Sequence, residues 1–187
     1  REVPFGLDGD FSRKALVHRI NSELANDFGN LLNRSLGMLG KYFSGTVPSP
    51  GQPGEEEQAL RAKAEDILQK VDEAMEELEL GRALATIWEL VKAGNKYVDQ
   101  TAPWALAKDP ARRERLGTVL YTVLEAARIC VLLSAPCIPV AAQRMWEALC
   151  CEGAVEKAVL SSAGRWGGLP EGATLARSAV AFPRIED

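Results

Sequence analysis

The sequence is poor in the residues that most enzymes use for chemistry. It contains one histidine, His18, among 187 residues, and no GxSxG motif, CxxC motif or glycine-rich phosphate loop. A serine triad needs a histidine base beside a nucleophile, and a phosphate loop needs closely spaced glycines before a helix, so both kinds of site are disfavoured. Its many carboxylates, such as those at 55–57, fit solvated helix faces, and we predict no catalytic residue.

The four cysteines lack the spacing of a metal site. Cys130, Cys137, Cys150 and Cys151 show no CxxC pattern, and only His18 could add an imidazole ligand. Adjacent Cys150 and Cys151 are too close for an ordinary bridge. We therefore predict core thiols in a reducing compartment, with no disulfide, no zinc and no cofactor bound by this chain.

Export and membrane signals are missing as well. Residues 1–10 lack the sections of a secretory signal, and we find no apolar run of about 18 residues that would span a membrane. The formal charge of −4 argues against a protein that coats nucleic acid non-specifically, although a local RNA site is compatible with it. No Met precedes Arg1, so we expect a soluble fragment of a longer chain.

The sequence does contain strong helical periodicity. Apolar residues at three- and four-residue spacing predict helices over the ranges 12–43, 55–80, 83–102, 111–134 and 139–150. Short connections between long helices favour antiparallel neighbours. The expected fold is therefore all-α, a mainly antiparallel bundle of about five helices with an irregular C-terminal tail. The broad apolar surface of 111–134 places that helix at the centre.

Proline, glycine and a polar cap mark the expected boundaries. Ser12 is positioned to cap the first helix, Gly81 is a plausible break between the second and third, and Pro103 ends the third. Pro139 fits the first turn of the last helix. The predicted division is a linker at 1–11, a helical domain at 12–160 and a turn-rich tail at 161–187 that packs on the bundle.

One face of the first helix is unusually rich in amides. With Phe28 at the centre of the buried stripe, a rotation of about 100° per residue places Asn26, Asn30, Asn33 and Arg34 on the opposite side. Asparagine is a poorer helix former than the Glu and Lys of an ordinary solvated face. The strip is therefore either a binding surface or a solvated face that weakens its helix.

Glycines add to the cost of this helix. Gly29, Gly37 and Gly40 lie in its interior, where each glycine costs about 1 kcal/mol relative to alanine. Close approach of another helix or of a ligand would compensate. We favour tight helix packing as the explanation.

Trp104 follows Pro103 in a short break between helices, where a large ring is either a core lid or partly exposed. Exposed aromatic rings stack on unpaired bases, while amides and guanidinium groups read base edges. Trp88 and Trp146 occupy apolar helical positions and are expected in the core. Trp104 is therefore the candidate base platform.

Six local segments form a specific set along nearly the whole chain. They are Asn21-Ser22-Glu23-Leu24-Ala25-Asn26, Gly29-Asn30-Leu31-Leu32-Asn33-Arg34, Trp88-Glu89-Leu90-Val91, Asn95-Lys96-Tyr97-Val98, Ala102-Pro103-Trp104 with Leu106-Ala107-Lys108, and Phe182-Pro183-Arg184-Ile185-Glu186. The set resembles the helical domain that follows the catalytic domain in methionyl-tRNA synthetases of bacterial or organellar type. The opening 1–12 is similar to the family's stretch after the KMSKS loop, but KMSKS and the HIGH-type signature are absent.

The resemblance implies an anticodon-binding domain. In the family, a tryptophan of the Ala-Pro-Trp segment stacks on the first base of the CAU anticodon, and an asparagine and an arginine of the first long helix read that cytosine. By motif position these residues are Trp104, Asn30 and Arg34. Supporting positions would be Asn26, Asn33 and Pro103, and two lysines that could approach phosphates are Lys96 and Lys108.

The same resemblance assigns the chemistry to another part of the protein. An intact member ligates methionine to tRNA with ATP, and both ATP and an optional zinc ion belong to the catalytic region. We therefore expect this chain to be inactive alone, with methionine tRNA and its own catalytic domain as partners and no membrane. The implied compartment is the bacterial cytoplasm or an organelle.

Two alternatives stay open on the sequence. The chain could be a helical scaffold that docks on another protein, which predicts Asn30 and Arg34 buried at a protein surface. It could also be the equivalent domain of a related synthetase for valine, leucine or isoleucine. The Ala-Pro-Trp and Phe-Pro-Arg-Ile-Glu segments favour the methionyl family.

Overall fold

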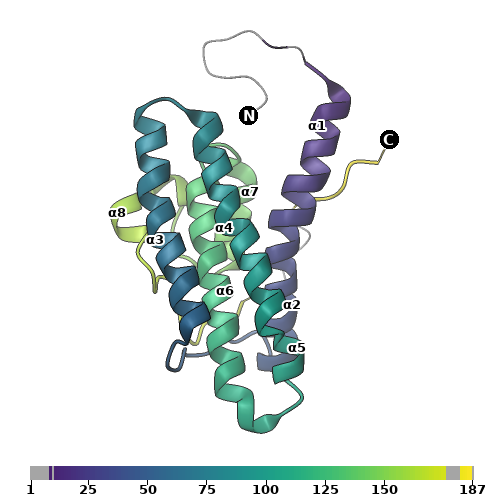
Figure 1. Cartoon of the computed structure of the whole chain (residues 1–187), viewed down its shortest axis with the longest axis vertical. Helices are drawn as coiled ribbons and strands as arrows, with labels where there is room; N and C mark the ends of the chain where they lie inside the picture. The colour runs from purple at the N-terminus through teal and green to yellow at the C-terminus, as the bar shows by residue number, and fades with distance from the viewer. Residues whose placement is uncertain (1–8, 10, 176–181, 187) are drawn as a thin grey trace.

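The structure is a computed structural model that describes residue 9, residues 11–175 and residues 182–186, so most of the expected linker lies outside the described residues. Regular structure in these ranges is helical, with long helices that run up and down beside one another (Figure 1). Within the described ranges there is no strand, and one isolated bridge pairs Thr46 with Thr174. The expected all-α, mainly antiparallel fold is confirmed.

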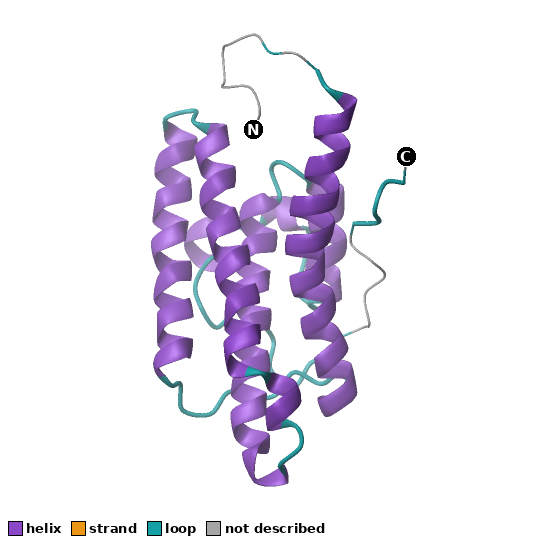
Figure 2. Cartoon of the chain, turned by 45° about the vertical axis from the view of Figure 1, so that its right-hand side comes forward, coloured by secondary structure: helices purple, strands orange, loops and turns teal. Residues whose placement is uncertain are grey.

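The helical elements follow in chain order. They are α1 (Arg13–Arg19), η1 (Ile20–Gly29), α2 (Asn30–Phe43), α3 (Glu55–Glu76), α4 (Leu80–Thr101), α5 (Pro103–Leu106), η2 (Pro110–Arg112), α6 (Arg113–Ser134), α7 (Pro139–Ala148), η3 (Val155–Lys157) and α8 (Leu160–Ala163). The first three form one continuous rod along one side of the bundle (Figure 2).

Helix α6 is the centre of the bundle, as its composition predicts. Every residue from 116 to 134 is buried, and α2, α3, α4 and α7 all contact this helix. The helical segment Pro110–Ser134 is long and apolar enough on average to span a membrane, which the search for an unbroken apolar run did not detect. Its apolar window is entirely buried inside the bundle, where these side chains contact protein.

The long first helix is confirmed, but its middle differs from a regular α-helix. The segment η1 is π-helical. Side chains donate hydrogen bonds to two carbonyls in or next to η1. The Ser22 hydroxyl donates to the carbonyl of His18, just before η1, at 2.8 Å, and Asn95 Nδ2 donates to the carbonyl of Asp27, within η1, at 3.0 Å. Such bonds compete with the backbone amide ladder. The regular periodicity assumed from the sequence does not detect this competition.

The three glycines of the rod differ in their surroundings. A Cβ on Gly29 would lie 3.0 Å from the carbonyl of Leu24 and 3.4 Å from the ring of Phe182, so tight packing explains this glycine. A Cβ on Gly37 or Gly40 would meet nothing within 4 Å. Helix packing is therefore the wrong explanation for Gly37 and Gly40.

Capping residues were predicted well, with one error. The Ser12 hydroxyl accepts from the Ala15 amide at 3.2 Å, α4 ends before Pro103 and α7 begins at Pro139 as expected, whereas the single-turn helix α5 that begins at Pro103 was not predicted. The break at Gly81 is wrong because Gly81 lies inside α4. The chain instead reverses at Leu78, which has a φ of 57° and precedes a bond from Glu79 N to Ala74 O of 2.8 Å. A left-handed leucine carries no recognisable sequence signal.

The core-thiol interpretation holds for Cys130, and Cys151 is partly buried against the core. Cys130 is fully buried in α6, and this burial raises the pKa of its thiol. Cys137 and Cys150 are exposed, so placing them in the core was wrong. Both lie at the ends of helices, where the periodic pattern that indicates burial has already stopped.

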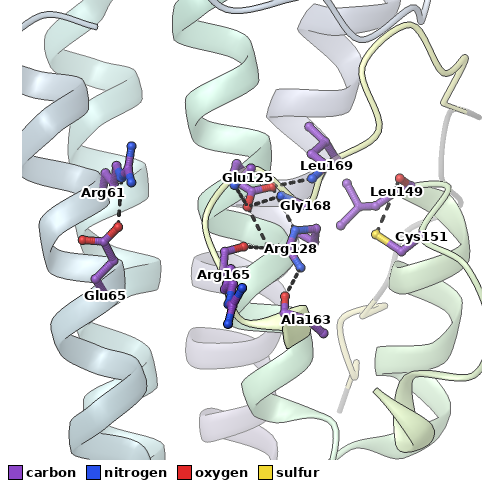
Figure 3. Close-up of polar contacts among 11 residues, drawn as sticks. Arg61, Glu65, Glu125, Arg128, Leu149, Cys151, Ala163, Arg165, Gly168 and Leu169 are labelled. Carbon is purple, nitrogen blue, oxygen red and sulfur yellow. Dashed lines mark hydrogen bonds and ion pairs between the residues drawn. The ribbon is translucent and has the colours of Figure 1, made fainter. Parts of the chain in front are cut away.

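A buried ion pair attaches the segment after α8 to the central helix (Figure 3). Glu125 and Arg128 are 0% and 1% exposed, and Arg128 Nε and Nη2 donate to the carboxylate at 2.9 and 2.7 Å. The carboxylate also accepts from the backbone amides of Gly167, Gly168 and Leu169 at 2.8, 3.1 and 2.8 Å, and Arg128 donates to the carbonyls of Ala163 and Arg165 at 2.5 and 2.8 Å. The pair therefore holds residues 163–169 on the bundle.

A second buried carboxylate joins the starts of α3 and α6 to α4. Glu57 is 3% exposed and accepts hydrogen bonds from the Gly54 amide at 2.7 Å, from the Tyr97 hydroxyl and from Arg115. Burial opposes ionisation of Glu57, but the bonds from Arg115, Tyr97 and Gly54 outweigh it and hold its pKa below the ordinary value. The ionised form of Glu57 is thus part of the folded state.

We expect this cluster to make stability depend on pH. The pKa of Glu57 is lower in the folded state than the ordinary value of about 4.3, so its contribution is complete above about pH 5 and disappears as pH falls through the folded pKa. Denaturant unfolding between neutral and acid pH measures the effect. The Glu57→Gln variant has no proton to gain at this position, so it should lose less stability on acidification. Equal losses in the two proteins would contradict the assignment.

Candidate nucleic-acid interface

Arg34 and Trp104 meet at the surface beside α5. The Cζ atom of Arg34 lies 6.0 Å from the ring centroid of Trp104, and Arg34 Nη2 forms an ion pair with Asp99 Oδ1 at 2.8 Å. The Trp104 residue is 43% exposed and the Arg34 side chain 33% exposed. The guanidinium is therefore oriented by two neighbours and still reachable from solvent.

The backbone around Trp104 explains why its ring is exposed. Helix α4 stops at Ala102, which takes a left-handed conformation with a φ of 43°. Pro103, buried, is the first residue of the single-turn helix α5, and its carbonyl accepts from Ala107 N at 2.9 Å. Because the proline is fixed in the core, the next side chain points outward. A buried Pro103 thus directly precedes the exposed Trp104 in α5.

Asn30 lies on the same face of α2 as Arg34, one helical turn away. Its side chain is exposed, and the structure gives it no hydrogen bond to any described residue. Asn33 is half-buried and likewise makes no side-chain hydrogen bond within the described ranges. Asn30 thus leaves both its donor and its acceptor to a ligand.

Asn26, which the sequence offers as a supporting position, contacts another part of the chain. Its Oδ1 accepts from Arg184 of residues 182–186, which we call the C-terminal strap. Asn21 binds the same strap through two hydrogen bonds with the backbone of Ile185, at 3.0 and 2.9 Å. The ring of strap residue Phe182 lies 6.1 Å from that of Phe28. Asn26 therefore fixes the strap on η1 and does not reach Trp104.

Sequence reasoning identified the strap as a motif but not its contacts, since 164 residues separate Asn21 from Ile185. It also missed Asp99, the partner of Arg34. An acid on α4 five residues before Trp104 has no pattern that marks it as a site residue.

The arrangement suits binding of a planar, polar ligand. An exposed indole ring can stack on a base, a guanidinium donates hydrogen bonds, and an amide both donates and accepts them. Among the described residues, no group of three or more His, Cys, Asp or Glu could hold a metal ion. Trp104, Arg34 and Asn30 thus offer an exposed ring, a guanidinium and an amide from neighbouring parts of the bundle.

Comparison with known proteins agrees with this geometry. Residues 47–187 match the family model of the anticodon-binding domain of methionyl-tRNA ligase, and residues 1–36 match that of class I tRNA synthetases (M). The chain is 46% identical over 186 residues to a methionine–tRNA ligase of Caldanaerobacter subterraneus subsp. tengcongensis and 43% identical over 189 residues to methionine–tRNA ligase 1 of Bacillus cereus. Each alignment covers 100% of this chain, and the relatives are covered to 29% and 28%.

A solved structure shows the same fold. The apo methionyl-tRNA synthetase of Mycobacterium tuberculosis superposes with a TM-score of 0.92 and 36% identity, covering 100% of this chain and 37% of the other. Fold and site thus define an anticodon-binding domain of a tRNA synthetase. The chain belongs to the family of anticodon-binding domains of methionyl-tRNA ligase. It spans less than a third of the length of the curated relatives reported above.

Proposed function

We propose that this domain binds the anticodon loop of methionine tRNA and reads cytosine, the first base of the CAU anticodon. The contact between Arg34 and the exposed ring of Trp104 carries the proposal, because it places a stacking surface beside a directed donor. Asn30 adds an unpaired amide on the same helix face. Unstacked loop bases are recognised by aromatic stacking and by hydrogen bonds to their edges.

Each side chain has a separate role toward the base. Trp104 stacks on the splayed cytosine, Arg34 donates to its carbonyl oxygen, and Asn30 pairs its amide with the remaining polar edge. Uracil presents an acceptor where cytosine presents an amino donor, so one polar group stays unpaired when uracil binds. An unpaired buried polar group costs about 1–3 kcal/mol, which is the source of discrimination.

The intact protein, by this proposal, ligates methionine to tRNA using ATP. The second expected partner, besides methionine tRNA, is a catalytic domain in the same chain. The match of residues 1–36 to class I synthetases supports it. ATP, and zinc where it occurs, would be bound in that catalytic region. The relatives reported above are bacterial, which supports the bacterial cytoplasm and gives an organelle no support.

The two alternatives are less favoured. The scaffold alternative is disfavoured by the match of residues 47–187 to an anticodon-binding domain and by the methionine–tRNA ligases that align with the whole chain. The equivalent domain of a valine, leucine or isoleucine enzyme would match a different family description from the methionyl one.

Binding of two anticodon stem-loops by the full-length protein tests the proposal. We expect the CAU loop to bind more tightly than a UAU loop, by roughly 5- to 150-fold at one fixed salt concentration, because uracil leaves one polar group unpaired. A CAU loop with an altered stem sequence serves as the control and should bind like the original. Equal affinity for CAU and UAU, or no binding of either, would contradict anticodon reading by this site.

A further inference from the structure

A bare stretch of α2 leads away from the base-binding residues. Asn30, Arg34, Gly37 and Lys41 are separated by four, three and four residues, which places all four on one face of the helix. A Cβ on Gly37 would meet nothing within 4 Å. A helix-interior glycine costs about 1 kcal/mol relative to alanine, and no packing in the described chain compensates for it here. Gly37 is half-buried and has no side chain, so a ligand can approach the helix backbone closely at this point.

Two cations stand where this face ends. Arg113 Nη1, at the start of α6, donates to Tyr42 O at 3.3 Å, and its Cζ lies 4.6 Å from the ring centroid of Phe43. Lys41 Nζ lies 5.3 Å from the centroid of the Tyr42 ring. Aromatic faces and a carbonyl orient these side chains but leave their positive charge unneutralised. Neither cation has a carboxylate partner among the described residues.

Cations elsewhere on the bundle have different surroundings. The lysines and arginines of α3 pair with carboxylates, as Arg61 does with Glu65. Lys96, which the resemblance suggested as a phosphate contact, lines a hollow with Glu55 and Glu56 on the other side of α4. These acids would repel a phosphate, so we do not include Lys96 among the proposed phosphate contacts.

Residues 108–115, which follow Trp104, carry an excess of positive charge: four cations (Lys108, Arg112, Arg113, Arg115) against two acids (Asp109, Glu114). Lys108 and Arg112 follow Trp104 along the chain and are exposed without an ion pair in the described structure. The carboxylate of Asp109 is engaged in accepting from Ala111 N at 3.0 Å. This charge stands out because the whole chain carries a formal charge of −4. This positive charge favours the approach of a phosphate backbone to the end of the bundle that carries Trp104.

We propose that the α2 face from Gly37 to Lys41, together with Arg113, binds the phosphodiester backbone of the RNA whose base is held by Trp104 and Arg34. This inference rests on the proposed function. Gly37 lets the sugar-phosphate chain pass close to the helix, Lys41 supplies a point charge, and Arg113 offers a fork of donors that fits phosphate oxygens. These contacts position the loop without reading its sequence.

The salt dependence of stem-loop binding tests the cations in the full-length protein. Each phosphate contact contributes about 0.7–0.9 to the slope of log affinity against log salt. In the Lys41→Gln/Arg113→Gln double variant the fall of log affinity with log salt should therefore be less steep by about 1.4–1.8. Lys157→Gln, an exposed cation of η3, is the control and should leave the slope unchanged. The preference for CAU over UAU should be the same in all three proteins.

Substitution of Gly37 gives a second readout that a purely structural role would not produce. Gly37→Leu should raise the free energy of unfolding by up to about 1 kcal/mol, because leucine is the better helix former, and yet weaken stem-loop binding at least several-fold. The matched control is Gly81→Leu in α4, where a Cβ also meets nothing within 4 Å. Gly81→Leu should stabilise the protein and leave binding unchanged.

The outcomes separate this inference from the proposed function. Suppose that the salt slope is unchanged in the double variant, that Gly37→Leu binds as before, and that the CAU preference is intact. Phosphate binding by Gly37, Lys41 and Arg113 would then be overturned, while base reading by Trp104 and Arg34 would stand. Equal binding of CAU and UAU loops by the unsubstituted protein would overturn the proposed function, and with it the proposed phosphate contacts. If the double variant melts at a lower temperature, Lys41→Gln alone replaces it, because the Lys41 side chain is exposed and forms no ion pair in the described structure; an unchanged slope there also counts against the proposal.

Discussion

Replacing Trp104 with alanine is expected to weaken binding of the CAU stem-loop by roughly 5- to 150-fold, because stacking of one base on an aromatic ring is worth about 1–3 kcal/mol. The ring is 43% exposed, so its removal takes away a ligand surface more than core packing. The cation–ring contact with Arg34 is lost at the same time, which leaves the guanidinium held by Asp99 alone. Affinity and base preference should therefore fall together.

Two companion variants make this result interpretable. Trp104→Phe keeps a stacking ring and should retain most of the affinity. Trp88→Phe, deep in the core beside Phe28, should lower thermal stability while leaving the base preference unchanged. Binding by Trp104→Ala at the level of the unsubstituted protein would show that the base does not stack on this residue.

Replacing Glu125 with glutamine is expected to lower the free energy of unfolding by about 3–5 kcal/mol, the usual cost of breaking a buried ion pair. Five donor groups surround this carboxylate: two from Arg128 and the amides of residues 167, 168 and 169. Glutamine has one acceptor oxygen, and its NH₂ group would face other donors. Arg128 would also stay buried without a counter-charge.

Thermal unfolding measures the loss, which should lower the melting temperature by about 6–20 °C for a chain of this size. The matched control is Glu65→Gln, which breaks the Arg61–Glu65 pair of α3 (Figure 3). Those side chains are 57% and 51% exposed, so the control should lose at most about 1 kcal/mol. Arg128→Met should lower the free energy of unfolding less in the Glu125→Gln background than in the unsubstituted protein, because the ion pair is already broken there. Similar losses for Glu125→Gln and Glu65→Gln would contradict this account.

Most of the fold follows from local sequence signals. Apolar periodicity located the long helices, and it placed α6 at the centre because its apolar residues cover every side. Ser12 and Pro103 were found because capping and proline geometry act within a few residues. The reversal at Leu78 rests on a left-handed leucine that no residue type announces, and the π-helical segment η1 accepts a bond from Asn95 of α4, so neither has a local signature.

The candidate site divides in the same way. Periodicity alone put Asn30 and Arg34 on the polar side of the first helix, and the proline before Trp104 indicated a ring in a break. The contact between Arg34 and Trp104 joins two helices, and the Asp99 partner comes from a third element, so no spacing rule could supply them. Periodicity placed Asn26 on the same side of the first helix as Asn30 and Arg34, but Asn26 contacts the C-terminal strap. One side of a long helix can contact several different parts of the chain, so sharing a side does not place residues in one site.

The C-terminal strap has a consequence for the order in which the chain folds. Its bonds join residues 164 positions apart, whereas α3 and α4 are neighbours along the chain and pair early at little entropic cost. During synthesis the strap leaves the ribosome after every helix of the bundle has emerged. Phe28 and Gly29 therefore acquire their cover last, and the rod that carries Asn30 and Arg34 reaches its final state only when the last residues of this span have docked.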